Sequence, residues 1–215
     1  MKVSAIILGA GFGKRIGGRI PKQFLKLKDK SLLEILIDEF KKEKRIYEII
    51  VTVPERYLNR FKNRGKVKFI KGGILRQDSV FLAGKLIKKE SDYVLIHDAS
   101  RPFLNYKMIK CFIDNLKGED ALIFGRPAID TLKFVKENFI LRTVSRKNIW
   151  YAETPQGFKR KIFMRMLEVL EKSKKEFTDD SEIAERLGVK VKILKTPDLN
   201  FKITFKEDIK LIKLL

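Results

Sequence analysis

Short apolar runs alternate with amphipathic segments along most of this chain of 215 residues. The first run, Val3–Leu8, is branched and ended by glycine, which is typical of a strand buried on both faces. Further strands are predicted at 48–53, 67–70, 93–97, 121–125, 189–194 and 201–205, and helices at 31–44, 54–63, 77–89, 106–116, 160–172 and 179–187. This alternation predicts an α/β fold with a largely parallel sheet.

The stretch "DTLKFVKENFILRTVSR" at 130–146 breaks this rhythm. Apolar and polar residues alternate on both sides of Lys136-Glu137-Asn138, which predicts a β-hairpin rather than a helix. A hairpin this polar has little to bury alone, so we expect it to pack against something else, such as a second subunit. The length of the chain predicts a single domain over 1–215, with this hairpin as a subdomain at about 130–146.

The net charge of +21 invites a nucleic-acid reading. The lysines, however, are spread along the whole chain beside acids, and the sequence has no base-stacking, helix-turn-helix or zinc-finger motif. No specific nucleic-acid partner is therefore expected, and salt-sensitive binding to polyanions stays open only as a secondary activity. Cys111 is alone, which argues against a disulfide framework or a cysteine metal site. Without a membrane-length apolar run or the zones of a signal peptide, we expect a cytoplasmic protein with no membrane partner.

A glycine-rich and cationic segment follows the first strand. Its glycines are Gly9, Gly11, Gly13, Gly17 and Gly18, and they are interleaved with Lys14, Arg15, Arg19 and Lys22. Glycine lets the backbone bring its N–H groups close to a ligand, and the cations indicate that this ligand is anionic. The spacing fits neither the dinucleotide fingerprint nor the P-loop. We interpret the segment as a phosphate-binding loop of another kind; the alternative is an ordinary strand–helix turn with solvated charges.

Three further stretches carry candidate site residues. "KGGILRQDSV" places a second glycine pair, Gly72-Gly73, and then Arg76 before Ser79 at a predicted helix start. "YVLIHDASRP" ends a buried strand with Asp98, and open α/β sheets hold ligands at that end of their strands. A carboxylate there suits Mg²⁺ together with substrate phosphates. "NFKITF" places Lys202 within an otherwise apolar strand, where a lysine can also simply point outward.

Taken in order, these stretches resemble a known family. The matching segments are "AGFGKRIGGRIPKQF", "GGILRQDSV", "VLIHDASRP", "PAIDTLK", "TVSRKNIW", "ETPQGF", "FTDDSEIAE" and "NFKITFKEDI". Their order and spacing are similar to the 2-C-methyl-D-erythritol 4-phosphate cytidylyltransferases of the non-mevalonate isoprenoid pathway. The resemblance implies a Rossmann-like domain with a mixed, mostly parallel sheet and a protruding β-arm that helps form a homodimer. It also implies Mg²⁺-dependent transfer of CMP from CTP to 2-C-methyl-D-erythritol 4-phosphate, which gives the CDP-alcohol and pyrophosphate.

The same resemblance implies roles for individual residues. The loop from Gly9 through Gly13 to Lys22 would wrap the triphosphate, with Arg15, Lys22 and Lys202 as the catalytic cations. The nucleotide side would involve Ala10, Gly11, Gly72, Gly73 and Ser79. Asp98 would hold Mg²⁺, Arg101 would support that segment on the substrate side, and Thr131 and Arg146 would grip the acceptor's phosphate in the partner subunit's site.

The expected chemistry needs no strong general base, because a phosphate oxygen is already ionised at neutral pH. His97 is the single histidine of the chain, and we interpret it as a structural residue at a strand end. Catalysis would instead rest on positioning and on cations that stabilise charge. A ribitol 5-phosphate cytidylyltransferase is the alternative within the same fold.

Overall fold

The protein is described here from a computed structural model that places residues 1–11 and 20–214. A seven-stranded sheet with the order β11-β7-β10-β6-β1-β4-β5 forms its centre. The strands are β1 (Val3–Leu8), β4 (Ile46–Val53), β5 (Val67–Lys71), β6 (Tyr93–Asp98), β7 (Ala121–Pro127), β10 (Trp150–Lys159) and β11 (Val191–Lys195). Neighbouring strands are parallel except at β10, which runs antiparallel to β6 and β7. The predicted α/β fold with a mostly parallel sheet is confirmed.

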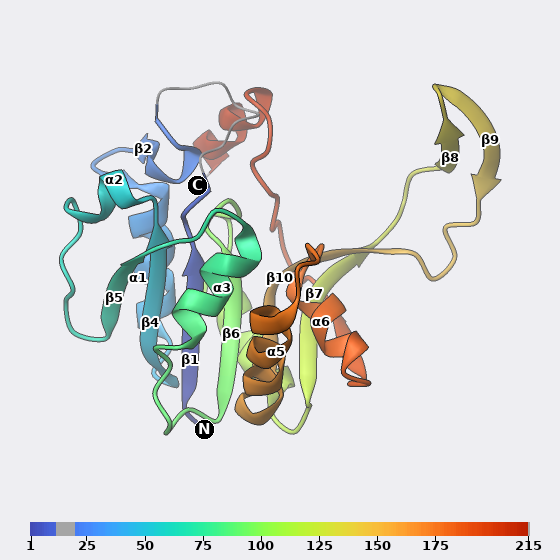
Figure 1. Cartoon of the computed structure of the whole chain (residues 1–215). Coiled ribbons are helices and arrows are strands. Elements are labelled where there is room, and N and C mark those ends of the chain that lie inside the picture. Colours follow the sequence, from blue (N-terminus) through green and yellow to red (C-terminus); the bar gives the residue numbers. More distant parts are fainter. Residues whose placement is uncertain (12–19, 215) are drawn as a thin grey trace.

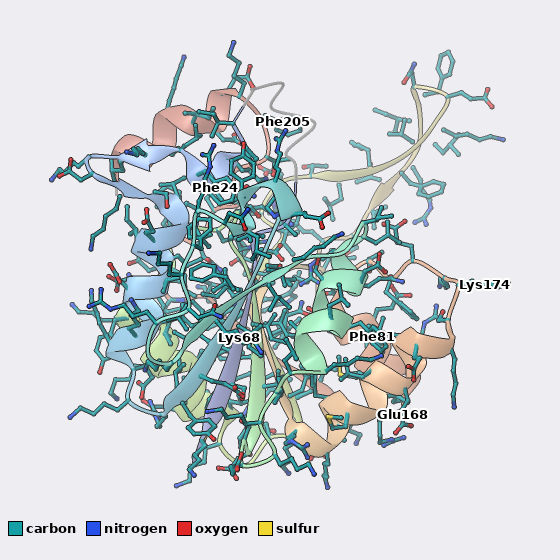
Figure 2. The ribbon with its side chains drawn as sticks, turned by 60° about the vertical axis from the view of Figure 1, so that its left-hand side comes forward. Phe24, Lys68, Phe81, Glu168, Lys174 and Phe205 are labelled. Atoms are coloured by element: carbon teal, nitrogen blue, oxygen red, sulfur yellow. The ribbon has the colours of Figure 1, made fainter. Side chains whose placement is uncertain are left out.

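Helices cover both faces of this sheet (Figure 1). One face carries α1 (Leu32–Lys42) and α4 (Tyr106–Leu116), and the other carries α3 (Arg76–Gly84), α5 (Arg160–Lys172) and α6 (Asp180–Arg186). Strand β1 shows why both faces need cover, since Ala5 and Ile7 belong to the apolar cluster under α1 and α4, whereas Ile6 belongs to the cluster under α3 and α5. Figure 2 shows Phe81 of α3 and Glu168 of α5 on the same side of the ribbon. No helix in the described part of the chain is both long and apolar enough to cross a membrane.

Local signals explain where several helices begin. The Ser31 hydroxyl accepts the backbone N–H of Glu34, whose carboxylate accepts the N–H of Ser31, so a capping box starts α1. Asn105 caps α4 by accepting the N–H of Met108 at 3.0 Å. The predicted helix at 106–116 has the observed bounds, whereas those at 54–63 and 77–89 are shorter: α2 (Glu55–Leu58) and α3. Small elements complete the body, namely β2 (Lys26–Leu27), β3 (Lys30–Ser31), and the 3₁₀ helices η2 (Lys22–Phe24) and η3 (Glu207–Leu214).

The predicted hairpin is confirmed and projects away from the body (Figure 1). Strands β8 (Leu132–Lys136) and β9 (Phe139–Val144) pair only with each other among the described strands. Glu137 and Asn138 turn the chain between them with φ values of 48° and 67°, the left-handed conformation that tight hairpin turns require. We call residues 130–146 the hairpin arm.

Two predictions about strands were wrong. Strand β10 was not predicted, because its middle carries Glu153, Thr154 and Gln156, polar side chains that an apolar pattern does not reveal. Conversely, residues 201–205 form no strand but an extended segment whose backbone bonds to loops and side chains. The N–H of Ile203 donates to the carbonyl of Ser100 at 2.8 Å, and the N–H of Thr204 donates to the Asp208 carboxylate at 2.7 Å. With its backbone groups used in this way, the segment borders the sheet's end instead of extending the sheet.

Candidate active site

A cleft of about 410 Å³ opens where β1 and β6 end side by side. The last residues of these parallel strands, Leu8 and Asp98, are partners in the register, so the segments that follow them share one edge of the sheet. Among its lining residues are the predicted nucleotide-side residues Gly9, Ala10, Gly11, Gly73 and Ser79. The cleft therefore lies at the carboxyl ends of the strands, where open α/β sheets bind ligands.

The glycine pair is required by close packing against this cleft. A Cβ on Gly72 would lie 2.1 Å from the Cβ of Ala10 and 2.8 Å from Oγ of Ser79. The N–H of Gly73 donates to the same Ser79 hydroxyl at 3.0 Å, which fixes the loop to the first turn of α3. The two glycine-rich stretches therefore pack against each other at Ala10 and Gly72, and Ser79 holds the Gly72-Gly73 loop.

Gln23 fixes the first glycine segment from the other side. Its Nε2 donates to the carbonyl of Gly9 at 2.6 Å and to that of Gly11 at 3.0 Å, and the side chain is buried. These two bonds hold the backbone at Gly9 and Gly11 beside the cleft. Gln23 was not predicted as a site residue, although it belongs to the quoted motif.

Two predicted catalytic lysines from opposite ends of the chain meet in the cleft. Nζ of Lys22 donates to the carbonyl of Ile203, and Nζ of Lys202 lies 2.7 Å from Oδ2 of Asp98. The extended segment at 201–205 therefore binds one lysine through its backbone and supplies the other. The predicted site residues Gly13 and Arg15 lie outside the described residues.

Asp98 is the centre of a buried ionic network. Oδ1 of Asp98 accepts Nε of Arg76 at 3.1 Å, and the two terminal nitrogens of Arg76 bind both oxygens of Asp180 at 2.9 and 2.7 Å. Burial alone would raise the pKa of Asp98, but Arg76 and Lys202 outweigh burial and hold that pKa well below its usual range. Asp98 is therefore an ionised carboxylate at any physiological pH.

Sequence reasoning missed the partnership of Arg76 with Asp180. Arg76 stood in a quoted motif, but nothing in the sequence linked it to an acid 104 residues away. Asp180 lies in the first turn of α6, where an acid favours the helix, but its side chain is only 1% exposed and pairs with Arg76. Its neighbour Asp179 is the residue that caps α6, by accepting the N–H of Glu182 at 2.9 Å.

His97 is fully buried behind the cleft. Its Nε2 contacts the carbonyl of Arg101 at 3.1 Å, and its Nδ1 contacts the Thr154 hydroxyl at 3.0 Å. Burial lowers the pKa of His97 to about 4, so the ring is neutral at physiological pH. These contacts support the interpretation of His97 as a structural residue that links β6 to β10.

A second cleft of about 240 Å³ adjoins the first and shares Arg76, Asp98 and Lys202 with it. Its other walls carry polar side chains, among them Gln156, Thr178 and Asp179. The predicted substrate-side residue Arg101 lines this second cleft rather than the first. A terminal nitrogen of Arg101 donates to the carbonyl of Asn200 at 2.7 Å, which holds the chain just before Lys202.

Thr131 and Arg146, the other predicted substrate residues, lie at the base of the hairpin arm. Both side chains are exposed, and neither lines the two clefts of its own subunit. The arm also exposes large apolar side chains, among them Phe139 at 76% and Ile140 at 62%. The structure thus gathers the residues of the body but not the two residues of the arm.

Comparison with known proteins agrees with this arrangement. The family model described as IspD, 2-C-methyl-D-erythritol 4-phosphate cytidylyltransferase, matches residues 3–215. Curated relatives of that name include those of Aquifex aeolicus, 40% identical over 98% of this chain and 95% of the relative, and Caldicellulosiruptor bescii, 39% identical over 97% and 95%.

Solved structures show the same likeness across the whole chain. The 4-diphosphocytidyl-2C-methyl-D-erythritol synthase of Anaerococcus prevotii is 30% identical, with a TM-score of 0.83 over 98% of this chain and 95% of that one. The 2-C-methyl-D-erythritol 4-phosphate cytidylyltransferase of Thermus thermophilus is 27% identical, with a TM-score of 0.83 over 100% and 98%. With the fold, the glycine loops and the Asp98–Lys202 cleft in place, the chain belongs to the 2-C-methyl-D-erythritol 4-phosphate cytidylyltransferase family.

Proposed function

We propose that this protein transfers CMP from CTP to 2-C-methyl-D-erythritol 4-phosphate, giving 4-diphosphocytidyl-2-C-methyl-D-erythritol and pyrophosphate. A phosphate oxygen of the acceptor forms a bond to the α-phosphorus of CTP, and the bond from that phosphorus to the pyrophosphate oxygen breaks. The observation that carries this proposal is the meeting of two clefts at the Asp98–Lys202 pair. Two substrates that react through phosphate groups require such a shared charged boundary.

The first cleft suits the nucleotide. The segments Gly9–Gly11 and Gly72-Gly73 place backbone beside the cleft without side chains in the way, which favours close contact with a base and with phosphates. Lys22 and Lys202 supply the positive charge that a triphosphate needs. Arg15 and Gly13 complete the proposed loop, as the family motif implies.

The second cleft suits a polyol phosphate. Gln156, Thr178 and Asp179 offer hydrogen-bond donors and acceptors for hydroxyl groups, and Arg101 and Lys202 offer positive charge for the phosphate. The acceptor would thus lie with its phosphate toward Lys202, on the opposite side of the boundary from the glycine loops.

Charge stabilisation, rather than proton abstraction, is the proposed means of catalysis. The buried, neutral His97 is bonded at both ring nitrogens and does not face either cleft. Lys22 and Lys202 would instead stabilise the negative charge that builds up as two anionic groups meet.

Asp98 is a suitable ligand for Mg²⁺. It is an ionised oxygen ligand on the cleft wall, and Mg²⁺ in such enzymes is held by one or two carboxylates together with substrate phosphates. No cluster of three or more metal-binding side chains occurs in the described ranges 1–11 and 20–214, so the phosphates would supply further ligands. Bound Mg²⁺ would neutralise phosphate charge, while Lys202, now on Asp98, would turn to the substrate phosphate.

The hairpin arm supports a homodimer. The arm projects from the body (Figure 1), and its exposed apolar side chains need a surface to cover them. Thr131 and Arg146 at its base line neither of the two clefts of their own body. We therefore propose that the arm packs on a second copy and that these two residues bind the acceptor's phosphate at the partner's active site, beside Lys202.

The experiment that tests this function is pyrophosphate release with CTP and Mg²⁺, comparing 2-C-methyl-D-erythritol 4-phosphate with ribitol 5-phosphate at matched concentrations. A strong preference for the methylerythritol phosphate is expected. A preference for ribitol 5-phosphate would retain the two-cleft mechanism and reject the substrate, and activity with neither would reject the assignment of the second cleft.

A further inference from the structure

A third cleft, of about 290 Å³, continues from the second and shares Arg101, Glu153 and Lys202 with it. Its other lining residues include Arg126, Tyr151 and Phe205. Figure 2 shows Phe205 at the upper end of the body, where the carboxyl ends of the parallel strands lie. Three cationic side chains, Arg101, Arg126 and Lys202, therefore line the third cleft, which adjoins the Asp98–Lys202 pair at Lys202.

Arg126 is held in this cleft by two contacts. Its Nε lies 3.0 Å from Oε1 of Glu153, and its guanidinium carbon lies 5.0 Å from the centre of the Tyr151 ring, its cross-strand partner on β10. The Arg126 side chain is nevertheless 55% exposed. With Nε directed to Glu153, the two terminal nitrogens are the pair that a planar, bidentate anion would use.

The Glu153 side chain is held in place by burial and by several hydrogen bonds. It is only 4% exposed, its Oε2 accepts the Thr196 hydroxyl at 2.9 Å and the Asn200 amide at 3.0 Å, and its Oε1 also lies 3.7 Å from Arg101. One carboxylate therefore faces two arginines. The other acid of this cleft, Asp208, accepts the N–H groups of Thr204 and Phe205, and its charge balances the second arginine, so the net positive charge of the cleft comes from Lys202.

Arg101 carries an unused donor at the same place. The residue is 9% exposed, and its Nε is buried without a hydrogen-bond partner among the described residues. Buried polar groups are nearly always bonded, so the Arg101 guanidinium has a hydrogen-bond donor that no described residue uses.

We propose that Arg126 is a further substrate-binding residue, which holds the phosphomonoester of the acceptor in the third cleft together with Arg101. This inference rests on the proposed function and deepens it, because it adds a cation of the body to the phosphate contacts proposed for the partner's arm. The acceptor's phosphate would then be held beside Lys202, from which it can reach the nucleotide, while its hydroxyl groups lie in the second cleft.

The test is a steady-state comparison of the wild-type protein with Arg126→Ala, Arg126→Lys and the control Arg165→Ala, an exposed arginine on α5. Arg126→Ala is expected to raise KM for the methylerythritol phosphate about tenfold, the effect of losing one charge-assisted contact, with KM for CTP and kcat nearly unchanged. Arg126→Lys keeps the positive charge but not the two coplanar terminal nitrogens of arginine. Its KM for the methylerythritol phosphate should therefore lie between those of the wild type and Arg126→Ala. The control should match the wild type.

A binding measurement gives a second readout that does not depend on turnover. Calorimetric titration of the acceptor into the protein with a non-hydrolysable CTP analogue should show the same weakening in Arg126→Ala. An unchanged KM and an unchanged affinity would overturn the inference, as would an equal loss for CTP and acceptor. If the wild type itself does not use the methylerythritol phosphate, the proposed function fails instead. Because Arg126 is half exposed, folding is expected to survive, and thermal unfolding of each variant verifies this.

Discussion

Nζ of Lys202 lies 2.7 Å from Oδ2 of Asp98, although the two residues are 104 positions apart in the chain. The pair forms the boundary between the cleft of the glycine loops and the cleft of polar side chains. Asp98 keeps a second cation, Arg76, on its other oxygen. If Lys202 binds a substrate phosphate instead of Asp98, the buried Asp98 carboxylate therefore still has Arg76 as a partner.

Replacing Lys202 with alanine should lower kcat for pyrophosphate release by roughly 10²-fold, the scale of losing one electrostatic donor in an active site. The reason is that the substituted site lacks a cation where the phosphates of both substrates meet. Lys206→Ala removes an exposed lysine four residues along and should leave kcat close to that of the wild type. A kcat for Lys202→Ala within threefold of wild type would rule out this role.

The Arg76–Asp180 pair should contribute to stability as well as to the site. Arg76→Met leaves Asp180, which is 1% exposed, without its bidentate partner, and breaking a buried pair in this way should lower the free energy of unfolding by ~3 kcal/mol. Arg186→Ala breaks a pair with Glu182 at the surface and should leave the free energy of unfolding close to that of the wild type. Urea unfolding at pH 7 measures both.

The double variant Arg76→Met with Asp180→Leu separates the pair's attraction from the cost of an isolated charge. Since both partners are then apolar, the part of the loss that comes from an unpaired Asp180 should return, whereas Asp98 still lacks Arg76 and keeps only Lys202. A double variant no more stable than Arg76→Met would show that the pair is not what holds these segments together.

His97 should make stability depend on pH between about pH 4 and 6.5. The folded state holds the pKa of His97 at about 4, below its ordinary value of 6.5, because the ring is buried. As pH falls through this range the unfolded chain takes up a proton that the folded protein does not, so stability falls, by up to about 3 kcal/mol for such a shift.

Urea unfolding of the wild type and of His97→Asn at pH 7 and pH 4.5 checks this. The drop between the two pH values should be smaller in the variant by about 2 kcal/mol, whatever its absolute stability. The low pKa of Asp98 has the same sign, but its contribution is lost only below the ordinary range of an aspartate, outside this window. Equal drops in both proteins would contradict the assignment of a neutral, buried His97.

The sequence predicts those helices and strands whose formation depends mainly on the pattern of residues close by in the chain. The α1 helix follows from its apolar stripe and the Ser31 cap, and β1 follows from an unbroken apolar run. Strand β10 could not be predicted in this way. Glu153 and Gln156 are 4% and 1% exposed, and both are buried because distant segments supply their partners, Asn200 for one and Asp179 for the other.

The residues of the candidate site likewise fall into those that a local motif identifies and those that depend on distant contacts. The glycine loops, Asp98 and Lys202 could be selected because they stand in ordered motifs that a family shares. Arg126 and the pairing of Arg76 with Asp180 could not, because each depends on a contact across the fold that leaves no local pattern. Glycine-rich loop motifs are thus easier to recognise in a sequence than the ion pairs that position side chains around them.

The hairpin arm allows a complementation experiment on subunits. In a dimer whose arm serves the partner's cleft, a subunit with Lys202→Ala can still supply Arg146, and a subunit with Arg146→Ala can still supply Lys202. Each variant alone should be impaired, Lys202→Ala in kcat and Arg146→Ala chiefly in KM for the acceptor. The mixed dimer, isolated after co-expression with two different tags, should contain one intact site and show about half of the wild-type activity.

The matched control is the mixed dimer of Lys202→Ala with Lys22→Ala. Both of these lysines line the cleft of the body, so every site in that dimer lacks one of them and no activity should return. Restoration in the first mixture but not in the second would establish that Arg146 acts across the interface. If the first mixed dimer stays as inactive as the control, the arm does not serve a partner, and the exposed Phe139 and Ile140 require a different cover.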